Sequence, residues 1–176
     1  NLGQSGNGCY RLVAAISGAS EAAAERVHEV LCLGTEVPEL SWDVLWRTVA
    51  AYLESGAGVD PSSALGAMQS IAAVLRRSPT ARAYHTNPDA QYLMQLPTLV
   101  AALVRERRAV VEAAFELLAA MCREDALACA VWDLLVGARF WCRPGVAHPR
   151  RQVVLRSVLR HTIGGSLRVC ASSAPY

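Results

Sequence analysis

The sequence contains no lysine, and no aspartate or glutamate follows Asp133. All 17 basic residues are therefore arginines, whose guanidinium groups pair bidentately with carboxylates and phosphates and tolerate burial at interfaces better than ammonium groups do. Residues 134–176 carry seven of these arginines and no opposing charge. Such a segment indicates a polyanionic partner, nucleic acid above all, and the alternative is a solvated basic tail without a specific partner.

The chain also lacks a long apolar run, because its longest apolar stretches span about ten residues and a membrane-spanning helix needs about 20. We therefore expect no membrane insertion. Hydrophobic residues nevertheless make up 53% of the 176 residues, more than is usual in a soluble protein. A chain of this length suits one domain and can bury a core without disulfides. The apolar excess favours buried interfaces between subunits, and an alanine-rich helical core without a partner is the other interpretation.

Catalytic and metal-binding motifs are missing as well. The six cysteines form no CxxC pair and have no histidine at metal-ligand spacing, so we expect a reducing compartment, no metal site and no cofactor. There is no GxSxG motif, and a GxxxxGK[ST] phosphate loop cannot occur without lysine. Glu112 and Glu116 share a predicted helix with Arg108, a spacing typical of a solvated face. We therefore expect that the protein is not an enzyme.

Apolar residues recur at helical spacing along most of the chain, which predicts an all-α fold. Residues 1–19, rich in glycine and polar side chains at their start, are predicted to form a flexible arm, in which Cys9 to Ile16 could form a short helix or strand. Ser20 and Ser41 are expected to cap two helices, and Gly34 to end the first of them. We recognise no internal repeat at the period of a helical solenoid.

The next two helices are predicted to form a long antiparallel hairpin. The first begins at Asp60-Pro61, because proline suits a first turn, and Pro79 should kink or interrupt it. The second is expected from about Asp89 to Met121, after a tight turn in HTNPDA. Such a hairpin, about 35–50 Å long at 1.5 Å per residue, leaves a large apolar face. A second copy would cover this face in a four-helix bundle across a two-fold axis.

A last predicted helix ends near Arg139 and is followed by the segment FWCRPGVAHPRR. Trp141 lies beside the helix end, and Pro144 and Pro149 should make the loop stiff and extended. A tryptophan with a neighbouring arginine often anchors an interface, and closure of the subunit's own core is the alternative.

The order of these features resembles the core (capsid) protein family of hepatitis-B-type viruses, including their non-enveloped relatives. The similarity runs from about Val27 to Gly164 and is carried by VHEVLCLGTEVPELSWDVL, YLESGAGVDPSSALGAMQSIAAVL, HTNPDA and, most closely, REDALACAVWDLLVGARFWCRPGVAHPRR. The resemblance implies an all-α capsid protein whose hairpin is half of a dimeric spike. Dimers would join into an icosahedral shell around viral nucleic acid.

The resemblance also implies site residues. Contacts between dimers would be made by Trp141, Arg143, Pro144, Val146, Ala147, His148 and Pro149, with His148 standing where the family usually has tyrosine. The spike within a dimer would be built on Leu65, Met68, Ile71, Leu75, Leu96, Val100, Leu103 and Val111. Nucleic acid would be bound by Arg150, Arg151, Arg156, Arg160 and Arg168.

On this interpretation residues 20–149 form the helical capsid assembly domain, between the arm of residues 1–19 and a basic extension of residues 150–176. The expected partners are further copies of the chain, viral RNA or DNA, and a viral polymerase. The expected locations are the virion and the cytoplasm or nucleus of an infected cell. Two alternatives stay open: a monomeric helical scaffold of the HEAT or armadillo kind, and a plain RNA-binding helical module.

Overall fold

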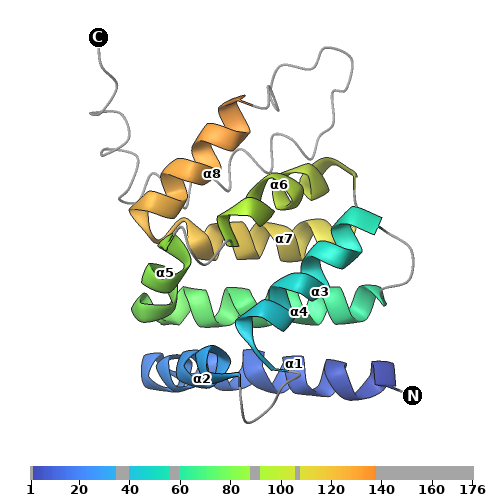
Figure 1. Ribbon diagram of the computed structural model, residues 1–176, viewed down its shortest axis with the longest axis vertical. Helices are drawn as coiled ribbons and strands as arrows, with labels where there is room; N and C mark the ends of the chain where they lie inside the picture. Colours follow the sequence, from blue (N-terminus) through green and yellow to red (C-terminus); the bar gives the residue numbers. More distant parts are fainter. Residues whose placement is uncertain (1, 35–39, 56–59, 88–91, 106–107, 138–176) are drawn as a thin grey trace.

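The computed structural model describes residues 2–34, 40–55, 60–87, 92–105 and 108–137, which are helical with no strand (Figure 1). The all-α prediction is confirmed for these residues. None of the helices described is both long and apolar enough to cross a membrane. The elements are α1 (Leu2–Ala19), α2 (Glu21–Leu33), α3 (Trp42–Ser55), α4 (Pro61–Arg77), α5 (Pro79–Thr86), the 3-10 helix η2 (Tyr92–Gln95), α6 (Leu96–Arg105), α7 (Arg108–Met121) and α8 (Asp125–Gly137).

The helix boundaries follow the capping residues expected from the sequence. Ser20 accepts a hydrogen bond from the backbone N–H of Ala23 at 3.1 Å, which satisfies a donor in the first turn of α2. Gly34 ends α2 in the left-handed conformation, with φ of 56°, where a side chain would be strained.

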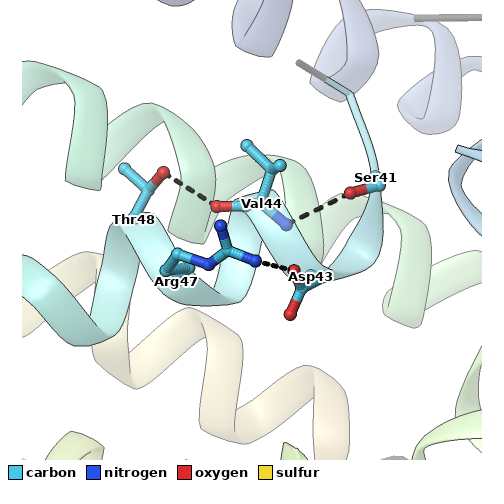
Figure 2. Close-up of polar contacts among 5 residues, drawn as sticks. All are labelled: Ser41, Asp43, Val44, Arg47 and Thr48. Atoms are coloured by element: carbon cyan, nitrogen blue, oxygen red, sulfur yellow. Dashed lines mark hydrogen bonds and ion pairs between the residues drawn. The ribbon is translucent and has the colours of Figure 1, made fainter. Parts of the chain in front are cut away.

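Figure 2 shows how α3 begins. The Ser41 hydroxyl accepts the N–H of Val44 at 3.2 Å, and the Thr48 hydroxyl donates to the Val44 carbonyl at 2.8 Å. Arg47 and Asp43 form an exposed ion pair one turn apart. These polar contacts leave the other side of α3 to the core, where the buried residues are Trp42, Leu45, Trp46, Val49 and Tyr52, as their spacing predicts.

Proline separates α4 from α5. Asp60 caps α4 and Pro61 occupies its first turn. Ser78 then caps α5 by accepting the N–H of Ala81 at 2.9 Å, and Pro79 opens that helix. Pro79 therefore interrupts the helix, which confirms the prediction made for it.

The residues predicted to form a flexible arm form α1 instead. Tyr10 and Val13 are only 7% and 5% exposed, and Ser17 is fully buried. The prediction failed because this segment begins with glycines and polar residues. The few apolar residues with which α1 packs therefore give only a weak helical pattern in the sequence.

The single helix predicted from Asp89 to Met121 is also wrong. Its described part consists of η2, α6 and α7, and residues 88–91 and 106–107 lie outside the described residues. α6 lies against α7, so the segment folds back on itself (Figure 1). Both helices are rich in buried apolar residues, so the apolar pattern alone does not mark the break between them.

Helices α1, α4 and α7 form a stack of three layers. α1 contacts α4, and α4 contacts α7. In Figure 1 the colour of each helix advances from right to left, so the three helices run in the same direction. Two further pairs of helices follow the same order along the chain: α2 contacts α5, and α3 contacts α6. The chain thus contains two three-helix units, α2–α4 and α5–α7, in which each helix touches its counterpart.

Candidate functional site

Two of the predicted sites lie outside the described residues. The inter-dimer loop, residues 141–149 with Trp141, Arg143 and His148, belongs to the undescribed part of the chain, as do the arginines from Arg150 onward. The predicted contacts between dimers and the predicted nucleic-acid contacts therefore stay predictions.

Most of the predicted spike residues lie in the core of the chain itself. Leu65 is half-buried, and the side chain of Leu103 is outside the described part. The others are between 0% and 8% exposed and belong to one core cluster: Met68, Ile71, Leu75, Leu96, Val100 and Val111. These side chains are not available to a second copy in this conformation. A spike built on them would require α4 and α7 to separate from their neighbours.

The contact between α1 and α4 is close because α4 contains a glycine there. The Ser70 hydroxyl donates to the Tyr10 carbonyl at 2.7 Å. A Cβ atom on Gly66 would lie 3.1 Å from the Tyr10 Cβ, which is tighter than ordinary van der Waals contact. Gly66 therefore lets the two helices approach, and the Ser70 hydroxyl, which also lies 2.8 Å from the Gly66 carbonyl of its own helix, can donate across the interface.

The contact between α4 and α7 fixes their relative direction. Arg76 Nη2 lies 3.5 Å from Glu116 Oε2, and Arg123 donates to the Arg76 carbonyl. Both contacts join the C-terminal end of α4 to the C-terminal end of α7, so the helices are parallel. In the predicted hairpin, the C-terminal end of α4 would instead meet the beginning of the returning helix.

Similar four-residue segments lie at matching positions of the three parallel helices, a pattern that the sequence alone did not make evident. The segments VAAI (13–16), IAAV (71–74) and LAAM (118–121) occur in α1, α4 and α7. Their first residues, Val13, Ile71 and Leu118, are all buried. Each lies seven residues before the residue that caps or opens the next helix, and these residues are Ser20, Ser78 and Asp125. A similar pair, VAAYL and VAALV, starts at Val49 of α3 and Val100 of α6.

Arg11, Gln69 and Glu116 lie two residues before the similar segments of α1, α4 and α7, and all three are exposed. Because the three helices are parallel and adjacent, we expect these matched positions to lie side by side. We call the surface that they define the outer face of the stack, and the three residues its polar row.

One side of α1 is open where its counterparts are covered. Leu12 and Ile16 are 59% and 43% exposed. The equivalent residues of α7, Leu117 and Met121, are fully buried. The side of α1 that carries Leu12 and Ile16 is therefore exposed to solvent, whereas the corresponding side of α7 is buried within the stack.

A buried group of tryptophans and histidines joins α2, α3 and α5. Trp42 Nε1 donates to His28 Nδ1 at 3.2 Å, and Trp46 Nε1 donates to His85 Nε2 at 3.0 Å. His85 Nδ1 lies 2.7 Å from the Ala81 carbonyl, so a neutral ring with its proton on Nδ1 satisfies both contacts. Burial lowers the pKa of His85 to about 4, and burial also lowers the pKa of His28.

This arrangement gives the histidines a role in packing. Both nitrogens of His85 are engaged and its ring is fully buried, so it presents no free base to a substrate. Across the described ranges, no three His, Cys, Asp or Glu side chains converge as metal ligands. Neither histidine is part of a motif that the sequence shows. A buried indole N–H requires an acceptor, and this requirement is the signal that could have indicated a polar partner for Trp42 and Trp46.

A second polar feature is a cavity of about 350 Å³ lined mainly by arginines. It lies where the C-terminal ends of α4 and α7 meet the start of α5 and the start of α2. The lining residues are Glu21, Arg76, Arg77, Pro79, Arg82 and Arg123. We call this cavity the arginine pocket. The sequence analysis missed it because the four arginines come from three separate segments of the chain.

Comparison with known proteins finds no family model, curated protein or solved structure that matches the chain. The packing of the described helices and the surfaces that this packing creates are therefore the observations that bear on its function.

Proposed function

We propose that the chain is an α-helical repeat scaffold, closest to the armadillo kind, that binds a partner protein along the outer face of α1, α4 and α7. The observation that carries the proposal is the parallel register of these helices, with each helix of α2–α4 touching its counterpart in α5–α7. Armadillo-like repeats have three helices, and repeats of this class contact only their neighbours. Stacks of this kind create extended binding surfaces.

The chemistry of the outer face supports this role. The row formed by Arg11, Gln69 and Glu116 offers a cation, an amide and a carboxylate on three adjacent helices, and the carboxylate is exposed although it pairs with Arg76. A polypeptide lying across the stack would meet all three groups in sequence. Binding of this kind requires no catalytic group.

The open side of α1 supports the same interpretation. Leu12 and Ile16 continue the apolar surface by which successive helices of the stack pack. We infer that a further helix of the same repeat type packs here, parallel to α1, since the same geometry is already present between α1 and α4.

The size of the purified chain separates the scaffold from the capsid interpretation. Sedimentation velocity and electron microscopy, at low and high salt, are expected to give a species near 18.9 kDa or a small oligomer of it. Uniform shells tens of nanometres across would contradict the scaffold and support the capsid. The burial of the predicted spike residues within one chain favours the first outcome.

Binding along the outer face can be tested by site-specific photo-crosslinking in cells. A photoreactive amino acid at Arg11 and, separately, at Gln69 should crosslink the same partner protein, identified by mass spectrometry. The matched control is Arg26, an exposed arginine of α2 that lies outside the row. Equal crosslinking of that protein from position 26 would contradict a binding surface on the stack.

A further inference from the structure

The arginine pocket has an excess of positive charge. Arg76, Arg77, Arg82 and Arg123 line it together with a single carboxylate, that of Glu21. Two other carboxylates are close, because Glu116 pairs with Arg76 at 3.5 Å and Glu25 accepts the N–H of Thr80, next to Pro79, at 3.3 Å. Four guanidinium groups therefore face three carboxylates, and Glu116 and Glu25 already have partners.

Two of the four arginines are held in place by the end of α4. Arg82 Nη1 donates to the Leu75 carbonyl at 2.8 Å, and Arg123 donates to the Arg76 carbonyl. Cations are favoured at this end of a helix because its last carbonyls carry partial negative charge. These two backbone contacts fix the guanidinium groups without neutralising them.

Donor capacity in the pocket remains unused. Arg82 Nε is buried and has no hydrogen-bond partner among the residues that the structure describes. Within the same residues, no hydrogen bond or ion pair reaches the Arg77 side chain, which is exposed at the rim. A buried N–H without an acceptor costs free energy, so a movement of the Arg82 side chain that brought its Nε to an acceptor in the pocket would be favourable.

The backbone N–H groups at the pocket are not available to a ligand. The N–H of Thr80 is taken by Glu25 at 3.3 Å, and the N–H of Ala81 by Ser78 at 2.9 Å. The first turn of α5 is therefore already satisfied. The pocket is distinguished by its side chains, which offer planar donor groups around a cavity of about 350 Å³.

We propose that the arginine pocket binds a phosphate group. Guanidinium forks match phosphate bidentately, and a group with nearly two negative charges offsets the excess of arginine better than one carboxylate does. The phosphate can belong to a phosphorylated side chain or to a free phosphate ion. The site goes beyond the scaffold proposal, because it does not depend on the partner bound at the outer face.

The proposal is tested by isothermal titration calorimetry of the full chain with inorganic phosphate, against sodium chloride at matched ionic strength. Phosphate is expected to bind the chain with a defined stoichiometry of one. Arg77→Gln should weaken binding about fivefold, as expected for loss of one charge-assisted contact at a partly exposed site. Glu21→Gln should tighten binding, because it removes the carboxylate that lines the pocket.

The matched control is Arg26→Gln, which removes an exposed arginine of α2 and the same net charge. This variant should bind phosphate like the unmodified chain. Equal weakening by Arg26→Gln and Arg77→Gln would show a general charge effect and overturn the site, as would the absence of phosphate binding. Arg77 is exposed and its side chain forms no hydrogen bond or ion pair with the described residues, so its loss is not expected to unfold the chain.

The source of the phosphate is distinguished by a second titration with a short peptide that carries one phosphoserine and with its unmodified twin. Tighter binding of the phosphopeptide than of inorganic phosphate assigns the pocket to a phosphorylated side chain. Equal binding of the two assigns it to phosphate itself. Binding of the unmodified twin as tight as that of the phosphopeptide would contradict recognition of phosphate.

Discussion

Trp46 of α3 donates its indole N–H to Nε2 of His85 in α5 at 3.0 Å. Both side chains lie in the core, although the two residues are 39 positions apart in the sequence. The two rings also lie within contact distance, with centroids 5.9 Å apart. The bond joins one repeat unit to the next, because α3 belongs to the first and α5 to the second. A neutral His85 is therefore part of what holds the units together.

Stability is expected to fall as the pH drops from 7.5 to 5. Burial lowers the pKa of His85 to about 4, whereas a histidine in the unfolded chain titrates near 6.5. Because the folded value is the lower one, the unfolded chain takes up the proton first. The neutral His85 therefore contributes fully to the free energy of unfolding above about pH 6.5. This contribution is lost as the pH falls towards 4, and the loss is about 2 kcal/mol at pH 5.

Denaturant unfolding at several pH values measures this loss. His85→Gln, which retains an acceptor for the Trp46 N–H but does not titrate, should reduce the pH dependence between 7.5 and 5. An unchanged pH dependence in this variant would mean that His85 is not the group responsible.

Alanine at two equivalent glycines is expected to act in opposite directions. Gly8 and Gly66 lie five residues before the similar segments of α1 and α4. A Cβ on Gly8 meets nothing within 4 Å, so Gly8→Ala should stabilise the helix by about 0.5–1 kcal/mol. A Cβ on Gly66 meets the Cβ of Tyr10, which moves only with the backbone of α1, so Gly66→Ala should cost about 1 kcal/mol. Thermal unfolding of both variants compares the two effects, and stabilisation by both would contradict the close approach of α1 to α4.

Leucines on the open and covered sides of the stack should differ in their contribution to stability. Leu12 of α1 and Leu117 of α7 occupy equivalent positions, but Leu12 is 59% exposed and Leu117 is fully buried. Leu117→Ala should cost about 2–5 kcal/mol, the usual range for a cavity in a core. Leu12→Ala should change the free energy of unfolding by no more than about 0.5 kcal/mol. Similar costs for the two substitutions, measured by urea unfolding, would contradict an open side on α1.

The sequence was informative about individual helices. Capping by Ser20 and Ser41, termination at Gly34 and interruption at Pro79 each depend on a local conformation that one residue type favours. The apolar stripes of α3 and α4 could be identified for a similar reason, because burial of a helix face requires helical spacing of apolar residues.

The relations between helices could not be predicted in the same way. Helical spacing identifies Met68 and Ile71 as buried but is the same whether the neighbouring helix is parallel, antiparallel or from a second copy. The similar segments of α1, α4 and α7 were overlooked because they are short, rich in alanine and unequally spaced. The ion pair between Arg76 and Glu116 joins residues whose proximity no local pattern indicates. The arginine pocket depends on the same long-range arrangement and was missed for that reason.

The repeat-scaffold proposal depends on the parallel arrangement of α4 and α7. The distance between Arg77 and Arg123 tests this arrangement most directly. Spin labels can be attached at these two positions in a variant whose native cysteines are replaced, and pulsed electron paramagnetic resonance measures their separation. Parallel helices packed about 10 Å apart predict a separation below about 25 Å, including the label tethers. A long antiparallel hairpin would separate the same positions by about 35–40 Å along its axis, and a distance in that range would contradict the repeat stack.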